Sequence, residues 1–539
     1  MTHPVAEAVL RYHEQTKHHL DRYARSLGYM DWENQPDPFR RYEGVPRIAL
    51  PLLSEDPAAG HRGLYEACRS PVSLGLTLIA GILELSMGLS AWKETAGSRW
   101  ALRMNPSSGN LHPTEAHLVL PAMEGCPGGV YHYFPLSHCL ERRAEISAEL
   151  WGLIRAHFGA DGFLIGLTSI FWRESWKYGE RAFRYCNHDV GHALAALRMA
   201  ASLFGWSLTG LIDLSDDAVE TVLGLAQTRF PALDAEHPDL LGYIHPNAAA
   251  ELPRTLPEGV LSAFAAIPFQ GTPNALSREH LDWEIIGQAA GHSRKPATRS
   301  PVSRWHRRAW LPAEESRLSA TQIIRQRRSA TAFDPSGSLP RKHFLAMLDR
   351  TLPRSGAAPF DVGLGEPALH LLLFVHRVAG LDPGLYFFCR DERELPDVRA
   401  HTRPGFLWEA VEPGFPLYCL ERGDFSRTAV MLSCHQDIAG SGAFSLGMIA
   451  RFGESLRREP FRYRHLFWES GMIGQVLYLE AEAHGARGTG IGCYFDDAVH
   501  EILGLAADRF QSLYHFTVGH PREDSRITTR PPYFHLSDR

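Results

Sequence analysis

The sequence predicts an α+β protein in which one folding unit of more than 200 residues occurs twice. The first observation is a near-repeat: DDAVETVLGL occupies residues 216–225 and DDAVHEILGL occupies residues 496–505, an offset of 496 − 216 = 280 residues. The second is that the same offset pairs Gly191 with Gly471, in two segments with the small-and-apolar spacing of a buried helix. These matches indicate a duplication rather than a solenoid, because the period is far too long for one.

A third observation extends the repeat toward the start of each unit. HLVL at His117 corresponds to HLLL at His370, and GVYHYF at Gly129 corresponds to GLYFFC at Gly384. Strand-like and helix-like segments therefore follow one another in the same order in both copies. Two related units in one chain are expected to pack as an intramolecular pseudo-dimer with an approximate two-fold axis.

The chain is too long for one ordinary core, which also favours several domains. The expected organisation is an N-terminal helical extension (1–60), a first unit (61–250), a connecting region (251–319) and a second unit (320–539). The connecting region is polar and contains proline, in the stretch SRKPATRSPVSRWHRR.

Composition restricts the class of function. The formal net charge is −6 and no long basic block is present, so a nucleic-acid partner is not expected. The apolar stretch from Val72 to Trp92 is long enough to span a membrane, but Glu84 at its middle would cost about 2.5–3.5 kcal/mol in a bilayer. A buried helix at a domain interface is expected there instead.

The eight cysteines are scattered without a CxxC pair, which argues against a disulfide framework and against a zinc ribbon. The first twenty residues lack a basic cap followed by an apolar core, so a secretory signal is not expected. A reducing cytoplasm is the expected location.

The first copy contains a turn rich in small polar residues, in RMNPSSGNLHPTEAHLVL. Pro106, Ser107, Ser108 and Asn110 offer side chains and a backbone suited to a flat polar ligand. A plain turn with a helix cap explains the same residues. The second copy has FDVGLGEPALHLLLF at this place, so it keeps the strand and lacks the turn.

The second copy has two features that the first lacks. It opens with QIIRQRRSATAFD, where Arg327, Arg328 and Ser329 offer a charged fork and a hydroxyl to a phosphate, although a solvated basic helix face is an alternative. It also contains ARGTGIGCYFDD, whose glycines allow backbone to approach a ligand closely. The copies together therefore predict one site between them for a flat, polar, phosphate-bearing molecule, and flavin mononucleotide (FMN) fits this description.

These segments, with WKYGERAFRYCNHDVGH and ESGMIGQVLYLEAEAHG, make the chain resemble the nitroreductase-fold flavoproteins. The resemblance covers both halves and is closest to the SagB-type thiazole/oxazole oxidase branch in tandem-fused form. It implies a mixed or antiparallel central sheet flanked by helices in each copy, with FMN bound at the interface.

The resemblance also implies roles for individual residues. Arg327 and Ser329, with Arg328, would hold the ribityl phosphate, completed by Arg526 near the C-terminus. The Pro106–Asn110 turn would reach the isoalloxazine from the other copy, and the loop of Gly490, Ile491 and Gly492 would lie near its redox edge. Thr331 departs from the family pattern, which usually has lysine or arginine there, so the tuning of the flavin is left open.

The catalytic candidates are Lys177 and Tyr178, which match the Lys-Tyr pair that the azoline oxidases use to take a proton while hydride goes to the flavin. The second copy has SLRREPF instead, so the pair occurs once. A lysine acts as a base only if its surroundings lower its pKa. An exposed lysine beside a packing tyrosine is the alternative.

Two further features that contain histidine give weaker evidence of function. His188 and His192 resemble part of a metalloprotease motif, but Asp189 replaces the glutamate and no third ligand is evident, so no metal is expected. His112 either lines the substrate side or caps the following strand.

The sequence therefore favours an FMN-dependent oxidoreductase that dehydrogenates a small heterocyclic or peptide-derived substrate. One alternative is an NAD(P)H-dependent reductase of nitro compounds or quinones. The other is a protein that stores or sequesters FMN without catalysis. The substrate itself is not evident from the sequence.

Overall fold

The computed structural model describes residues 4–67, 69–231, 233–246, 251–299, 309–312, 314–506 and 508–536. Its α-helices are α1 (Pro4–Gln15), α2 (Leu76–Glu84), α3 (Ala148–Phe158), α4 (Phe171–Tyr178), α5 (Ala182–Leu203), α6 (Asp216–Leu223), α7 (Glu258–Ala266), α8 (Glu284–His292), α9 (Ala320–Gln326), α10 (Arg341–Arg350), α11 (Leu395–His401), α12 (Ser426–Leu432), α13 (Ile438–Ser441), α14 (Gly453–Arg458), α15 (Arg462–Ala483) and α16 (Asp496–Leu503).

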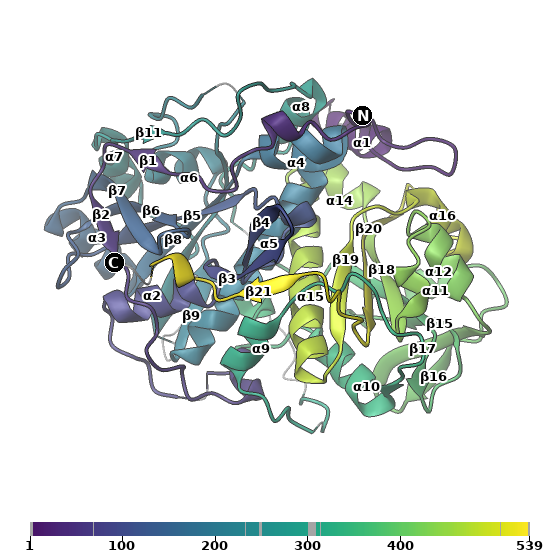
Figure 1. The fold of residues 1–539 in the computed structure, drawn as a ribbon. Coiled ribbons are helices and arrows are strands. Elements are labelled where there is room, and N and C mark those ends of the chain that lie inside the picture. Colours follow the sequence, from purple (N-terminus) through teal and green to yellow (C-terminus); the bar gives the residue numbers. More distant parts are fainter. Residues whose placement is uncertain are drawn as a thin grey trace.

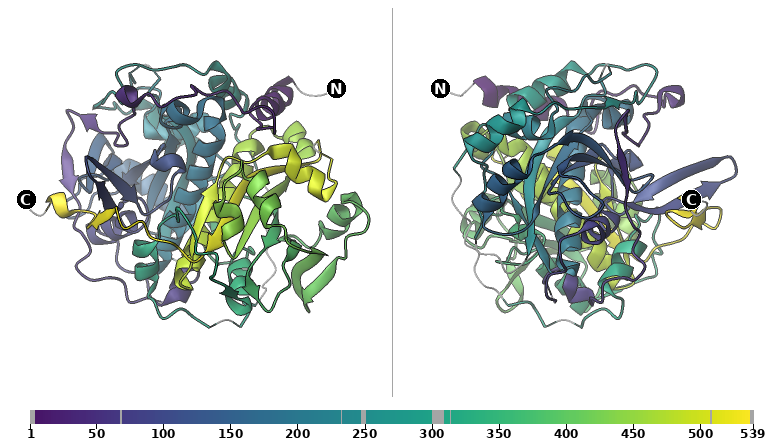
Figure 2. Two further views of the ribbon diagram at one scale, coloured as in Figure 1. Left: turned by 45° about the vertical axis from the view of Figure 1, so that its right-hand side comes forward. Right: turned by 90° about the vertical axis from the view of Figure 1, so that its left-hand side faces the viewer.

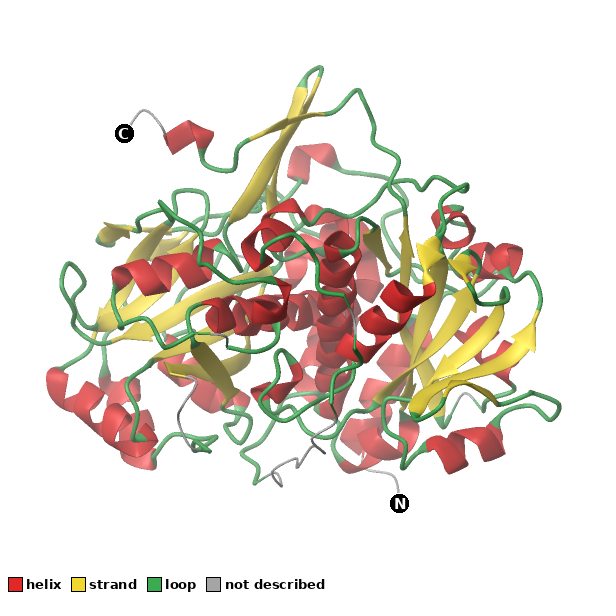
Figure 3. Cartoon of the chain, turned by 90° about the horizontal axis from the view of Figure 1, so that it is seen from below, coloured by secondary structure: helices red, strands yellow, loops and turns green. Residues whose placement is uncertain are grey.

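Two seven-stranded sheets form the framework, one on each side of the molecule (Figure 3). The first has the order β2 (Arg47–Ala49), β7 (Cys139–Glu145), β6 (Gly129–Phe134), β5 (Thr114–Leu120), β8 (Phe163–Ser169), β10 (His237–Pro246), β9 (Trp206–Gly210). The second has the order β16 (Glu409–Glu412), β17 (Phe415–Arg422), β15 (Gly384–Phe388), β13 (Leu369–Val375), β18 (Phe444–Arg451), β20 (Phe510–Gly519), β19 (Arg487–Ile491).

Six strands of each sheet correspond in order, whereas the edge strands β2 and β16 come from different places in the repeat. The described pairings in both sheets are antiparallel. An irregularity in strand pairing also recurs. The register shifts between Val130 and Tyr131, the second and third residues of β6, and between Leu385 and Tyr386, the second and third residues of β15. The repeated DDAV segments form α6 and α16, and each ends at a glycine with positive φ, Gly224 and Gly504. The structure confirms the predicted duplication and fold class.

The smaller sheets lie outside this framework. They are β1 (Tyr42–Glu43) with β11 (Thr272–Pro273), the parallel pair β12 (Leu339–Pro340) with β14 (Val378–Ala379), and β3 (Leu89–Thr95) between β4 (Ser98–Arg103) and β21 (Thr528–Arg530).

The long helices α5 and α15 lie side by side between the two sheets, at the centre of the molecule (Figure 1). They cross at the glycine pair found in the sequence. A Cβ on Gly191 would lie 2.1 Å from the Trp468 carbonyl oxygen, and one on Gly471 would lie 2.1 Å from the carbonyl oxygen of His188. Glycine is required at both places because the backbones touch, and the reciprocal contacts mark the pseudo-two-fold axis.

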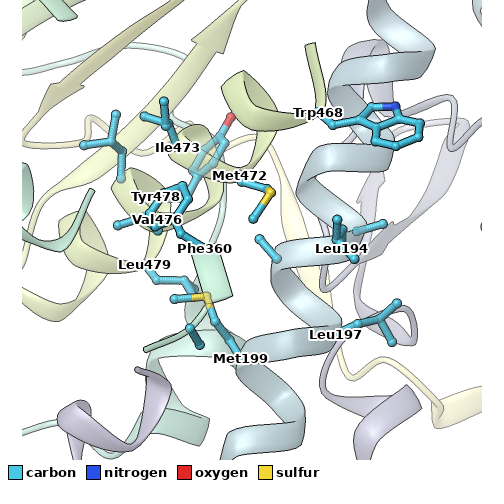
Figure 4. Close-up of a cluster of buried hydrophobic side chains, with 14 of the residues drawn as sticks. Leu194, Leu197, Met199, Phe360, Trp468, Met472, Ile473, Val476, Tyr478 and Leu479 are labelled. Atoms are coloured by element: carbon cyan, nitrogen blue, oxygen red, sulfur yellow. The ribbon is translucent and has the colours of Figure 1, made fainter. Parts of the chain in front are cut away.

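One continuous hydrophobic core joins the two copies around these helices. Leu194 and Met199 of α5 and Met472, Ile473 and Val476 of α15 belong to it (Figure 4). The copies therefore form an intramolecular pseudo-dimer, as predicted, rather than two separate domains on a linker.

Both ends of the chain cross to the opposite copy (Figures 1 and 2). The N-terminal α1 packs against α14, and its His13 is hydrogen-bonded to Gln511 at 2.9 Å. At the other end, β21 pairs with β3, and the Trp92 indole donates a hydrogen bond to the Pro532 carbonyl at 2.8 Å. These arms fasten each copy to the other.

The apolar stretch from Val72 to Trp92 divides into α2 and the start of β3. Glu84 at the end of α2 is buried, accepts a hydrogen bond from the Leu53 amide at 2.8 Å and forms an ion pair with Arg325 of the second copy at 2.6 Å. Its charge therefore belongs to the interface between the copies. Among the described helices, none combines the length and the apolar character that crossing a membrane requires.

The N-terminal and connecting segments add elements to the first copy. Of the described residues before 61, only α1 is α-helical, and β2 forms the edge of the first sheet. Within 251–319, α7 packs on α6 and α3. Residues 247–250 and Cys68 lie outside the described part of the chain, and the domain boundaries at 60, 250 and 320 stay a prediction.

Candidate functional site

A cavity of about 1120 Å³ opens between the two copies, and we call it the interface cavity. Its walls come from the turn after β4, one face of α5, the segment after α9, the end of α15, β19 with its following loop, and the C-terminal segment before β21. Its volume exceeds the 300–1,000 Å³ typical of a small-molecule pocket, so it has room for a cofactor and a substrate together.

Most of the residues singled out from the sequence line the interface cavity. They are Pro106, Ser107, Ser108, Asn110, Tyr178, Arg327, Arg328, Ser329, Thr331, Gly490, Ile491 and Gly492. Arg526 is not in this lining: its side chain is 85% exposed and pairs with Asp524 at 2.7 Å, whereas its neighbour Arg522 does line the cavity. Thr331 is exposed at the cavity wall.

The serine pair of the turn is held from within the protein. The Ser107 hydroxyl oxygen accepts a hydrogen bond from the His112 amide at 2.7 Å. The Ser108 amide and hydroxyl both donate to the Asp189 carboxylate, at 3.1 and 3.2 Å. The serine side chains therefore fix the shape of the turn and are already engaged, which the sequence did not indicate.

Asn110 fixes the protonation of the neighbouring imidazole. Its Nδ2 donates to the Ala101 carbonyl at 2.9 Å, so its Oδ1 faces Nε2 of His112, also at 2.9 Å. Burial lowers the pKa of His112 well below its ordinary value, and the neutral ring must carry its proton on Nε2. Its Nδ1 is then a buried acceptor without a partner among the described residues.

One face of α5 supplies further cavity residues that the sequence analysis missed. Tyr185, Asp189 and His192 are spaced at i, i+4 and i+7 and all line the cavity. Burial raises the pKa of Asp189 to about 7, so this carboxyl exchanges its proton near neutral pH. The sequence feature that indicates these residues is their polar character at helical spacing in an otherwise apolar, buried helix.

The two histidines of the HDVGH segment have separate partners. Nε2 of His188 lies 3.0 Å from the Leu513 carbonyl oxygen, and Nε2 of His192 lies 3.2 Å from the Tyr514 hydroxyl. Burial lowers the pKa of both rings, so they are neutral packing residues in this arrangement.

Arg327 connects the second copy to the polar turn of the first. Its Nε donates to the Met104 carbonyl at 3.0 Å and its Nη2 to the Arg103 carbonyl at 3.1 Å, while the guanidinium lies over the Tyr478 ring. Nη1 makes no hydrogen bond to any described residue. Two backbone carbonyls thus hold the arginine in place and leave donor capacity for a ligand in the cavity.

Arg328 and Ser329 make different contacts from those of Arg327. Arg328 donates through Nη2 to the Ser90 carbonyl at 3.0 Å, and its amide donates to Glu482 at 3.1 Å. The Ser329 hydroxyl is hydrogen-bonded to the Tyr478 hydroxyl at 2.9 Å. Arg328 therefore contacts both copies, and Ser329 is oriented by α15.

This end of the cavity carries excess positive charge. Lys93, Arg487 and Arg522 join Arg327 and Arg328 in the lining, against three carboxylates, Glu482, Glu523 and Asp524. Burial, followed by the charge of Arg328, lowers the pKa of Lys93. Burial and the charge of Arg327 lower the pKa of Arg328 to about 10. The cations repel one another here, and an anion would relieve that repulsion.

The glycine loop after α15 has a packing reason for its composition. A Cβ on Gly490 would lie 1.9 Å from the Tyr514 hydroxyl, and one on Gly492 would lie 2.1 Å from the Tyr185 ring. Glycine is therefore required by two aromatic side chains that press on the backbone. The loop still forms the cavity wall, as the sequence predicted.

Lys177 and Tyr178 end α4 beside the polar turn. A Cβ on Gly109, which has a φ of 59°, would lie 2.8 Å from the Tyr178 hydroxyl and 3.2 Å from Nζ of Lys177. Both head groups thus touch the turn, although only Tyr178 lines the cavity. Burial, followed by the charge of Glu174, raises the pKa of Tyr178 well above its ordinary value, so the hydroxyl is protonated at neutral pH.

Glu174 is a buried acid behind this pair. Its side chain is fully buried, and neither carboxyl oxygen has a hydrogen-bond partner among the described residues. Burial, reinforced by Asp189, raises its pKa well above the ordinary value. Folded Glu174 therefore keeps its proton to a higher pH than an ordinary glutamate, and unfolding favours its release.

The Glu174→Gln variant is expected to be more stable than the wild type at pH 8, because the amide replaces a carboxyl that must take up a proton on folding, and each pKa unit of that difference is worth about 1.4 kcal/mol. Folded Glu174 holds its proton above the ordinary glutamate pKa, so unfolding releases a proton and wild-type stability falls as pH rises past that value. Urea unfolding at pH 5 and pH 8 should show a gain that is larger at pH 8. Glu84→Gln, which breaks an ion pair, should be destabilising, and a Glu174→Gln variant that loses stability at both pH values would contradict this account.

The face of α15 that corresponds to the cavity-lining face of α5 borders a much smaller second pocket, whose lining residues all belong to the second copy. The second pocket is lined by His465, Glu469 and Met472, each 280 positions after a cavity residue of α5. Glu469 accepts a hydrogen bond from the Ala368 amide at 2.9 Å, as Asp189 does from Ser108. The second pocket has a volume of only about 30 Å³, enough for one or two water molecules.

Comparison with known proteins gives the fold. No family model matches the chain. The structure of a candidate nitroreductase from Anabaena variabilis is similar with a TM-score of 0.69 and 22% identity, covering 96% of this chain and 99% of that one. The chain therefore has the nitroreductase fold, in two fused copies.

Two curated proteins are similar in sequence over shorter stretches. A candidate nitroreductase of Methanocaldococcus jannaschii is 26% identical over 188 residues, which are 33% of this chain and 90% of that protein. The trifolitoxin-processing protein of Rhizobium leguminosarum bv. trifolii is 31% identical over 129 residues, 22% of this chain. The match covers 35% of that relative's length.

Proposed function

We propose that this chain, which carries the nitroreductase fold twice, is an FMN-dependent oxidoreductase of the SagB type. It dehydrogenates a heterocyclic or peptide-derived substrate, with FMN and substrate together in the interface cavity. The observation that carries the proposal is the asymmetry between the corresponding faces of α5 and α15: the first borders a cavity of about 1120 Å³ and the second a pocket of about 30 Å³. Packing alone would fill the space beside both helices to a similar extent. A large, charged cavity beside only one of them is therefore expected if that cavity binds a ligand.

The residues of the interface cavity fit FMN. The cationic end of Lys93, Arg327 and Arg328 suits a phosphate monoester, which carries a charge of about −1.5 to −2 at pH 7. Near the polar turn, Nδ1 of His112 and Oδ1 of Asn105 are buried acceptors of lining residues without partners among the described residues. Such acceptors suit the N–H edge of a flavin ring.

The proton is assigned to the Lys177–Tyr178 pair. Tyr178 lines the cavity as a protonated hydroxyl, with Lys177 beside it on the polar turn. We assign the neutral form of the Lys177 amine as the final acceptor of the substrate proton, which reaches it directly or through the Tyr178 hydroxyl. Bound FMN supplies the hydride acceptor. The protein excludes water from the reacting face with the rings of Tyr185, Tyr478 and Tyr514.

Similarity to the trifolitoxin-processing protein supports a peptide-derived substrate for this chain. A folded protein does not fit in a cavity of this size, but a short segment carrying a five-membered heterocycle does. The best probe is therefore a short peptide that contains a thiazoline, which becomes aromatic on losing a hydride and a proton.

Reconstitution is expected to give one FMN per chain. The second pocket lacks the volume and the cationic end that the interface cavity has. Equilibrium dialysis against FMN, followed by absorbance of the released flavin, measures the ratio. Met472→Ala, in the second pocket, should leave it at one. Either two equivalents per chain or none after reconstitution would contradict the proposal.

A further inference from the structure

Two cysteines from different loops of the second copy meet at the wall of the interface cavity. Cys434 follows α12 and Cys493 follows β19, and both are half-buried, free and in the cavity lining. Hydrogen bonds tie their loops together: the Phe495 amide donates to the Leu432 carbonyl at 2.8 Å, and Nε2 of Gln436 donates to the Cys493 carbonyl at 3.2 Å. The fold therefore holds the two thiols as a pair.

The backbone at Cys434 is held in an unusual conformation. Cys434 and His435 are consecutive non-glycine residues with positive φ values of 50° and 60°. Such values are disfavoured for residues that carry a Cβ and persist only where the surroundings impose them. The two cysteine side chains lie close enough that each shifts the pKa of the other.

The N-terminal segment adds polar groups to both sulfurs. Nδ1 of His18 accepts a hydrogen bond from the Ala24 amide at 2.9 Å, which leaves the proton of the neutral ring on Nε2. The His18 ring lies close enough to Cys493 to lower the pKa of that thiol, and the Tyr23 hydroxyl interacts with Cys434. Because Nε2 carries the proton, His18 acts toward the sulfur as a donor and not as a metal ligand.

A buried cation completes the surroundings of Cys493. Arg181 donates through Nε and Nη2 to the Gly492 carbonyl, at 3.4 and 3.2 Å, next to the cysteine. Its Nη1 is paired with the buried Asp496 carboxylate at 3.1 Å, which offsets part of its charge. The hydrogen bond from Cys434, then His18 and the charge of Arg181, lower the pKa of Cys493. The same pairing and burial raise the pKa of Cys434. The two thiols thus differ: one is stabilised as a thiolate and the other as a thiol.

The geometry points to a redox-active dithiol at the interface cavity, with Cys493 as the attacking sulfur and Cys434 as the resolving one, open to small-molecule disulfides. This assignment does not depend on the proposed flavin. It rests on the juxtaposition of two cavity-lining sulfurs, the donor His18 and the cation Arg181.

The exchange proceeds in two steps whose atoms and electrons balance. The Cys493 thiolate attacks one sulfur of a small disulfide, its S–S bond breaks, and a thiolate leaves. Cys434 then loses its proton and attacks the Cys493 sulfur, which expels the second thiolate and closes the Cys434–Cys493 bond. The two cysteines are oxidised, the small disulfide is reduced to two thiols, and the Cys434 proton goes to a departing thiolate.

Oxidised glutathione is the probe, with the full-length protein and Cys68→Ser in every sample, since Cys68 lies outside the described residues. After exposure, free thiols are alkylated and located by peptide mass spectrometry. The wild-type pair is expected to lose both thiols without a glutathione adduct. Cys434→Ser is expected to trap glutathione on Cys493, and the buried Cys126, Cys186 and Cys389 serve as internal references.

Alkylation of Cys493 in Cys434→Ser gives a second readout. In His18→Ala the rate near pH 6 should fall severalfold relative to the His18 protein, because the donor to the thiolate is gone. The inference is overturned if glutathione settles equally on both cysteines, if a stable adduct remains on the wild type, or if neither thiol reacts. A bound metal ion that shields both thiols until a chelator is added would also overturn it.

Discussion

Replacing Lys177 by alanine is expected to slow dehydrogenation of a thiazoline peptide by a factor on the order of 10²–10⁴, the usual cost of losing a general base. The lysine Nζ and the Tyr178 hydroxyl both contact the polar turn at Gly109, and the tyrosine is held protonated by burial. Without the amine, the substrate proton loses the acceptor that we assign to it. The measurement is the single-turnover rate of FMN reduction by the peptide.

The control separates proton transfer from flavin binding. Lys177→Ala should retain FMN, and dithionite should reduce it at the wild-type rate, because that reaction needs no base from the protein. Tyr178→Phe shows whether the proton passes through the hydroxyl: a loss as large as that of Lys177→Ala indicates that it does. If Lys177→Ala keeps full activity on a peptide that the wild type oxidises, Lys177 is not the base. If NADPH reduces the wild-type flavin rapidly and the peptide does not, the reductase alternative replaces the proposed dehydrogenase.

Much of the fold was predictable because the duplication leaves a local record in the sequence. The spacing of small residues around Gly191 and Gly471 predicted two buried helices, and these helices form the interface. The terminal arms were not predictable. The pairing of β21 with β3 joins residues more than 430 positions apart, and no periodicity encodes such a contact.

The candidate site was predictable to the level of residues but not of atoms. The sequence placed the Pro106–Asn110 turn and Arg327 in one site, and Arg327 bonds directly to the strand end before that turn. It did not indicate that Asp189 already holds Ser108, since that bond depends on how α5 packs. Cys434 and Cys493 carry no joint signal either, because their loops meet only in the folded second copy.

Arg526 shows why a residue role taken from a family resemblance can be assigned to the wrong position in a sequence. A basic residue near the C-terminus was expected at the phosphate, and Arg526 was the nearest choice in the sequence. The structure turns that side chain to solvent with Asp524 and brings in Lys93 from β3, which is hydrogen-bonded to Thr529 of the crossing C-terminal segment at 2.7 Å. Which cation faces the cavity is decided by strand pairing, which sequence alone does not show.

Arg327→Ala is expected to weaken FMN binding by about ten- to a hundred-fold, since a hydrogen bond to a charged group contributes roughly 1.5–3 kcal/mol. Arg327 is buried at the cationic end of the cavity, with Nη1 free of hydrogen bonds to described residues. However, its other nitrogens hold the carbonyls of Arg103 and Met104, so its loss also disturbs the first copy. Affinity for FMN alone would not separate the two effects.

Riboflavin, which lacks the phosphate, distinguishes a loss of phosphate binding from a disturbance of the polar turn. If Arg327 binds the phosphate, the variant loses affinity for FMN and keeps most of its affinity for riboflavin, so the ratio of the two dissociation constants changes by the full factor. If the arginine only supports the turn, both ligands weaken alike and the ratio is unchanged. Arg526→Ala, exposed and paired with Asp524, is the matched control and should alter neither constant. High salt should reduce the FMN advantage of the wild type and leave riboflavin binding unaffected, because only the phosphate interaction is electrostatic.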